Sequence, residues 1–181
     1  VLNGGEMRFS GGAHDMTDVT FGGDGVVRFA GGTSTLQGTV SYDVGETLVS
    51  GGTVVFNADA VSDVLTHTGG TLSGPAVYTV RNSFDWRGGI QTGGGETVVL
   101  AGAQLLLTTG GEKDLDGRAL SHYGTSGSVW NDGNFRMDNG AFRTFLRPPS
   151  RTDNQIVALI GAVAASGLLY LLGADTVAGL F

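Results

Sequence analysis

The sequence predicts an all-β protein, a right-handed parallel β-helix of about seven coils with ~20 residues each. Glycine pairs recur along the chain at intervals of 20, 20, 18, 19 and 22 residues. Strand-like runs fill these intervals, and no helical period with caps occurs in residues 1–145. An interval near 20 residues is typical of a solenoid, whose repeats stack one upon the next. The pairs are Gly11-Gly12, Gly31-Gly32, Gly51-Gly52, Gly69-Gly70, Gly88-Gly89 and Gly110-Gly111.

Each glycine pair is expected at a corner between two strands. Corners demand a positive φ or a close approach of two backbones, and glycine meets both demands. Thr33, Thr53 and Thr71 follow three of the pairs directly, so each is expected to begin the next strand. Strand signals of two kinds, alternating apolar and polar residues or β-branched apolar runs, lie between the corners. They occupy residues 40–44, 53–56, 77–80, 84–86 and 97–100.

Composition excludes several classes of function. The chain of 181 residues carries 17 acidic against 10 basic side chains, a net charge of −7, whereas nucleic-acid binding needs a basic face. There are no cysteines, so disulfides, thiolate catalysis and cysteine-ligated metals are absent. The 33 glycines lack the every-third-residue spacing of collagen.

The C-terminal part differs from the repeats. We expect a β-solenoid domain over residues 1–146, a linker over 147–153 and an apolar helical segment over 154–181. Residues 154–174 contain no charge and are long enough to cross a bilayer as a helix. The alternative is that this segment caps the solenoid's open end, which otherwise exposes strand edges and core. Both interpretations stay open.

The second half of the repeat region resembles bacterial surface β-solenoid repeats, found in large secreted adhesin-like and autotransporter-like proteins. The similarity is carried by residues 84–89, FDWRGG, and 110–120, GGEKDLDGRAL, and it continues in 128–133, SVWNDG, and 138–142, DNGAF. The resemblance implies an extracellular or cell-surface structural role without catalysis.

Two motifs contain oxygen ligands that a cation could use. Residues 22–27 are similar to a calcium-binding nonapeptide, but Val27 stands where that motif needs an aspartate, so no calcium site is expected. Glu112, Asp114 and Asp116 alternate, so a strand would direct them to one face. They are interpreted as solvated carboxylates, with a loose cation site or a catalytic pair as the alternative.

Histidines and tryptophans give the remaining candidates. His14, His67 and His122 are too far apart in sequence for a zinc motif, so no metal site is expected. Trp86 and Trp130 are candidate carbohydrate contacts through their apolar ring faces, with packing inside the coils as the alternative. No catalytic or cofactor motif is present.

These observations predict a non-enzymatic structural or adhesive rod of a cell-surface or secreted protein. Its partner would be a carbohydrate or a protein, with no nucleic acid and no cofactor, and the C-terminal segment would anchor it if it spans a membrane. One alternative is a carbohydrate-active β-helix enzyme. Another is a tail-anchored intracellular scaffold, because Arg147 and Arg151 precede the apolar segment and only Asp175 follows it.

Overall fold

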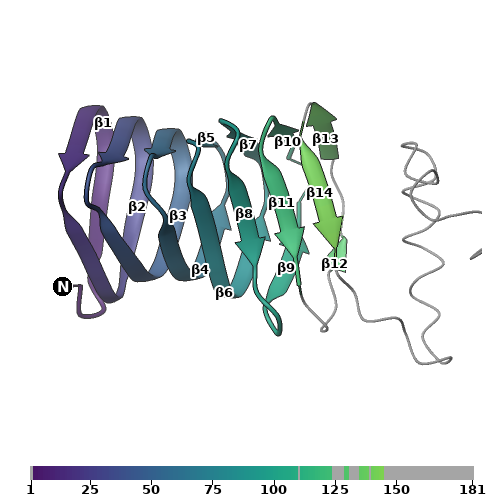
Figure 1. Ribbon diagram of the computed structural model, residues 1–181, viewed down its shortest axis with the longest axis horizontal. Coiled ribbons are helices and arrows are strands. Elements are labelled where there is room, and N and C mark those ends of the chain that lie inside the picture. Colours follow the sequence, from purple (N-terminus) through teal and green to yellow (C-terminus); the bar gives the residue numbers. More distant parts are fainter. Residues whose placement is uncertain (1, 110, 124–128, 131–134, 139, 145–181) are drawn as a thin grey trace, which may run out of the picture. The chain divides into compact units, whose positions relative to one another are not determined.

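A computed structural model describes residues 2–109, 111–123, 129–130, 135–138 and 140–144. These residues form a parallel β-solenoid of about six turns, with successive coils side by side (Figure 1). Its strands are β1 (Glu6–Thr17), β2 (Thr20–Gln37), β3 (Ser41–Phe56), β4 (Ala60–His67), β5 (Thr71–Ser73), β6 (Val77–Trp86), β7 (Gly89–Thr92), β8 (Glu96–Val99), β9 (Gln104–Leu107), β10 (Lys113–Asp116), β11 (Ala119–His122), β12 (Val129–Trp130), β13 (Phe135–Asp138) and β14 (Ala141–Thr144).

The coils consist of three ladders of parallel strands, which we call faces A, B and C. The long strands β1 to β4 and β6 bend at a corner, so each of them contributes to more than one ladder. Face A joins the first part of β1, the middle of β2 and β3 and the ends of β4 and β6 to β9 and β12. Face B joins the ends of β1, β2 and β3 to β5, β7, β10 and β13. Face C joins the starts of β2, β3, β4 and β6 to β8, β11 and β14.

The register of face A shows the repeat directly. One continuous row of paired residues runs through six coils, and its members lie 20, 20, 18, 19 and 21 positions apart. Parallel pairing at this offset places equivalent residues of neighbouring coils about 4.8 Å apart. The row consists of Glu6, Val26, Glu46, Val64, Ser83 and Gln104.

The core lies inside the coils, where alternate side chains of all three faces meet. Aromatic rings cross from one face to another: Tyr42 and Tyr78 of face C both pack against Phe56 of face B, with ring centroids 5.4 and 5.0 Å apart. The buried hydroxyls are satisfied inside the core, since Tyr42 bonds Thr47 at 2.7 Å and Tyr78 donates to Ser62 at 2.9 Å. Burial raises the pKa of both tyrosines, so they stay neutral.

The glycine corners lie where the sequence predicts them. In the described pairs up to Gly88-Gly89, the second glycine adopts a positive φ, for example +68° at Gly52 and +78° at Gly70. The backbone of the preceding coil also occupies the space of a side chain there, since a Cβ on Gly70 would lie 2.6 Å from the Gly52 carbonyl oxygen. Conformation and close approach therefore both require glycine at Gly70.

The expected all-β parallel solenoid is confirmed, and each predicted strand segment lies mainly in an observed strand. Two finer expectations are not. The seventh coil is described only in β12 to β14, and residues 154–181, expected to be helical, lie outside the described residues. The part of the chain that the structure describes contains no helix, and thus none with the length and apolarity to cross a membrane.

Candidate functional site

The outer side of face B carries an uncharged patch, which we call the threonine face. Thr33, Thr53 and Thr71 pair in register across three coils, each directly after a glycine corner. The parallel row beside them is Thr35, Val55 and Ser73. Ile90, which pairs with Thr71, and Thr92 on β7 extend the surface by one coil. The threonine face thus consists of Thr33, Thr35, Thr53, Val55, Thr71, Ser73, Ile90 and Thr92.

The side chains behind this surface are buried in the core. They form a buried column inside face B, in which Ser34, Val54, Leu72 and Leu115 are almost wholly inaccessible. Because strand side chains alternate, the buried column directs the flanking threonines outward. β-branched side chains have few χ1 rotamers, so the threonine and valine side chains of the outward rows are rigid.

Carboxylates lie beyond both ends of the threonine face. Asp15 pairs with Thr35 from the first coil, and Asp114 and Asp116 pair with Ile90 and Thr92 from β10. Between them, the two rows of the threonine face present only hydroxyl, methyl and other apolar groups, and the exposed amide of Gln37 lies beside them at the end of β2. Each threonine can donate and accept one or more hydrogen bonds while its methyl group contacts apolar surface. Such a surface suits a ligand with its own hydroxyls and apolar patches.

A buried polar network lies at the corner between faces B and C. Arg118 is inaccessible to solvent and bonds groups on two preceding coils. Its Nε donates to Thr97 Oγ1 at 2.9 Å, and Thr97 donates in turn to Gln91 Oε1 at 2.7 Å. The guanidinium also donates to three backbone carbonyls: Gly74 at 2.9 Å, Ala76 at 3.1 Å and Glu96 at 2.9 Å.

Burial lowers the pKa of Arg118 to about 10, so it still carries its charge at neutral pH. Lys113 is similar: it is 2% exposed, and its Nζ donates to the carbonyls of Thr109 and Gly111, both at 2.9 Å. Burial lowers the pKa of Lys113 as well. Both cations close corners of the coils with hydrogen bonds to backbone oxygens, so their role is structural.

Of the two candidate carbohydrate contacts, Trp86 is described with its side chain and Trp130 by its backbone alone. Trp86 is fully buried on face A, where its ring stacks on His67 at 5.9 Å with an interplanar angle of 1° and on Phe84 at 5.7 Å. A buried ring presents no face to a sugar, so packing inside the coils describes Trp86. The backbone of Trp130 pairs with Leu107, and its side chain lies outside the described part.

The histidines are not brought together. His14 lies on face B, His67 on face A and His122 on face C. His67 is fully buried, and its Nε2 lies 3.3 Å from the Gly70 carbonyl oxygen. Burial lowers the pKa of His67 to about 4, and it also lowers that of His122.

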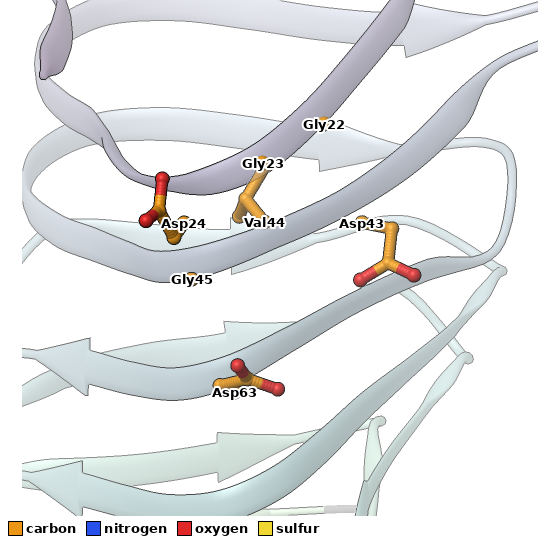
Figure 2. A pocket seen from close by; sticks show the side chains of 7 residues that line it. All are labelled: Gly22, Gly23, Asp24, Asp43, Val44, Gly45 and Asp63. Carbon is orange, nitrogen blue, oxygen red and sulfur yellow. The ribbon is translucent and has the colours of Figure 1, made fainter. Parts of the chain in front are cut away.

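An acidic hollow lies where face C meets face A (Figure 2). Its lining includes Asp24, Asp43 and Asp63 from three successive coils, together with Gly22, Gly23, Val44 and Gly45. Arg81 bridges two of these carboxylates, at 2.6 Å from Asp43 and 3.4 Å from Asp63, and lowers the pKa of Asp43. Asp24 instead accepts a hydrogen bond from the Gly4 amide at 3.0 Å. Each carboxylate therefore has a structural partner or neighbour.

The acidic motifs show no metal centre. In the calcium-like motif, Val27 is fully buried in the core. On β10, Asp114 and Asp116 alternate with the buried Lys113 and Leu115, while Glu112 is exposed just before the strand. Among the described residues, no group of three histidine, cysteine or acidic side chains is arranged to hold a metal ion.

The sequence patterns predict neither the threonine face nor the buried cations. They place Thr33, Thr53 and Thr71 only at strand starts, although the recurrence of these threonines after the glycine pairs is a signal of an outward row. The burial of Arg118 has no such signal, because only the three-dimensional corner supplies its carbonyl partners. Comparisons of this chain with protein-family models, with curated proteins and with solved structures find no match.

Proposed function

We propose that this chain is a non-enzymatic structural rod of a cell-surface or secreted protein, and that its threonine face holds an extended carbohydrate. The observation that carries the proposal is the in-register row Thr33, Thr53 and Thr71, with its neighbour row, on an otherwise acidic molecule. A rigid, uncharged row of hydroxyl groups can bind an extended ligand along its length, and it contains no pair of groups suited to catalysis.

A neutral polysaccharide is the ligand class that suits this surface. Polysaccharides present hydroxyls and apolar ring faces at regular intervals, and the rows repeat every ~4.8 Å. The net charge of −7 and the aspartates at both ends of the face disfavour a polyanionic chain. Binding at many weak sites along one chain gains affinity through multivalency.

The interior supports a structural role. Each coil pairs mainly with its immediate neighbours, so the stack can present the same face over a long distance. The buried cations, with the tyrosine, threonine and glutamine side chains inside the coils, direct hydrogen bonds inward, where they reinforce corners and core. Membrane anchoring through residues 154–181 stays a separate prediction that the rod proposal does not need.

The test is a charge placed on the threonine face. Thr53→Glu and Thr71→Glu are expected to weaken binding to neutral polysaccharides at least about tenfold, because a carboxylate must be desolvated on contact. Binding would be measured on a polysaccharide panel by affinity electrophoresis. Thr79→Glu is the matched control, since Thr79 is a half-buried outward threonine on face C.

Equal weakening by all three variants, or no binding to any member of the panel, would refute the proposed carbohydrate face. The same incubations should be assayed for new reducing ends. Their release by the wild-type chain would favour the carbohydrate-active enzyme over the rod.

A further inference from the structure

Several glycines of this solenoid are required because the backbone of the preceding coil leaves no space for a Cβ atom. Gly31 and Gly51, the first members of their pairs, have no positive φ, so conformation does not require glycine there. A Cβ on Gly31 would lie 2.9 Å from the Ser10 carbonyl oxygen, and one on Gly51 would lie 2.7 Å from that of Ala30. Real Cβ atoms do not approach so closely, so the coil before each of these residues demands glycine.

Gly11 is the equivalent residue of the first coil, and nothing in the structure demands glycine there. Its φ is outside the left-handed region, and a Cβ would meet no atom within 4 Å. Gly5, at the corner just before face A, is a second glycine of this kind. Its equivalents by register are Gly25, where a Cβ would lie 2.6 Å from Leu2 Cβ, and Gly45, where it would lie 2.7 Å from the Asp24 carbonyl carbon. A Cβ on Gly5 would meet nothing.

The edge beside these glycines is open. Among the described strands, β1 pairs with β2 alone, so its 12 residues leave one row of backbone groups without a ladder partner. The core is open there too: Phe9 stacks on Phe29 at 5.4 Å but is only partly buried, and Met7 is 41% exposed. An unpaired strand edge with apolar side chains is a template for another strand.

Residues 2–5 already follow the path of a coil above β2. The Leu2 amide donates to the Gly22 carbonyl at 2.7 Å, and the Leu2 carbonyl accepts from Gly25 at 2.9 Å. The Gly5 carbonyl accepts from Val26 at 2.8 Å. These are the bonds that the first coil makes with the second, so residues 2–5 belong to the same coil as β1 and continue its register.

We propose that the free edge of β1 is the docking surface for one more parallel coil, formed by residues of the same polypeptide N-terminal to Val1. That coil would place backbone carbonyls against Gly11 and Gly5 and cover Met7 and Phe9. The same polypeptide is favoured over a second copy because residues 2–5 begin the first coil, and the offset of ~20 residues between coils places the chain that precedes them beside the free edge of β1.

The first test adds the coil. A copy of residues 21–40 placed directly before Val1 continues the register, because residues 1 and 21 are one coil apart. In the chain as it stands, Gly11→Ala is expected to leave Tm unchanged, whereas Gly51→Ala lowers it by roughly 5 °C or more. In the extended chain, Gly11→Ala should become as costly as Gly51→Ala. An extended chain in which Gly11→Ala is still harmless would overturn the docking geometry.

The second test identifies the source of the coil. Mass spectrometry of the protein from its natural source should find a glycine pair near 20 residues before Gly11. A natural N-terminus within about five residues of Val1 overturns the proposal, because no coil then precedes β1 in the same chain. Sedimentation of the present chain provides the other arm: concentration-dependent association that Gly11→Ala abolishes would assign the edge to a second copy and would also overturn it.

Discussion

Replacing Arg118 with methionine is expected to lower the free energy of unfolding by about 3–5 kcal/mol. The side chain is fully buried and makes hydrogen bonds at 2.9 to 3.1 Å to Thr97 and to three backbone carbonyls. Methionine fills much of the volume but donates nothing, so the three carbonyls of two coils are left buried without this donor. Urea denaturation monitored by circular dichroism measures the loss.

Arg81→Met is the matched control. Arg81 also makes several polar contacts, at 2.6 and 2.8 Å to the two oxygens of Asp43 and at 3.4 Å to Asp63, but its side chain is 41% exposed. Water replaces these contacts, so a loss of at most about 1 kcal/mol is expected. If the two variants lose similar stability, burial of the Arg118 network is not what stabilises this corner.

Acidification from pH 7 to pH 4 is expected to remove about 3 kcal/mol of stability through His67. Burial lowers the native pKa of His67 to about 4, whereas a histidine in the unfolded chain has the ordinary pKa of 6.5. As the pH falls below 6.5, His67 becomes protonated in the unfolded chain while it stays neutral in the native state, so the free energy of unfolding decreases. The contribution is complete above pH 6.5 and is lost as the pH approaches 4.

The variant His67→Phe isolates this effect. Phenylalanine keeps a flat ring beside Trp86 and does not titrate. Because it has no ring nitrogen, it lacks the contact with the Gly70 carbonyl oxygen at every pH. The difference in unfolding free energy between wild type and variant, measured at half-unit steps from pH 7 to pH 4, should shrink as the pH falls. His122 and the carboxylates are common to both chains and cancel to first order. A difference independent of pH would show that His67 is not held neutral by the fold.

Much of the architecture was predictable because glycine has few uses in a strand-rich chain. The pairs from Gly11-Gly12 to Gly88-Gly89 predicted corners, and positive φ values at Gly32, Gly52 and Gly70 confirm them. The β-branched runs between the corners predicted strands for the same local reason. Because these signals are local in sequence, corners and strands can be predicted without knowledge of the contacts between coils.

What the sequence did not reveal depends on contacts between coils. A lone arginine such as Arg118 reads as a surface residue until the carbonyls of Gly74 and Glu96 are seen converging on it. Trp86 had two interpretations, and only the stack with His67 and Phe84 distinguishes them. The outward direction of Thr53 likewise follows from the buried column behind it. Equivalent positions in different coils cannot be aligned reliably until the register is known.

The unequal coils show how this architecture tolerates genetic change. Five residues separate the buried Leu36 of face B from the buried Tyr42 of face C in the second coil, whereas three separate Phe56 from Ala60 in the third. Both arrangements keep their rows in register, because the extra residues bulge at a corner and leave the strands untouched. A single codon gained inside a strand would instead turn every following side chain to the opposite face. Insertions and deletions can therefore accumulate at this corner while the ladders stay fixed, and a gene of this kind can lengthen by whole coils without redesign of the parts it already has.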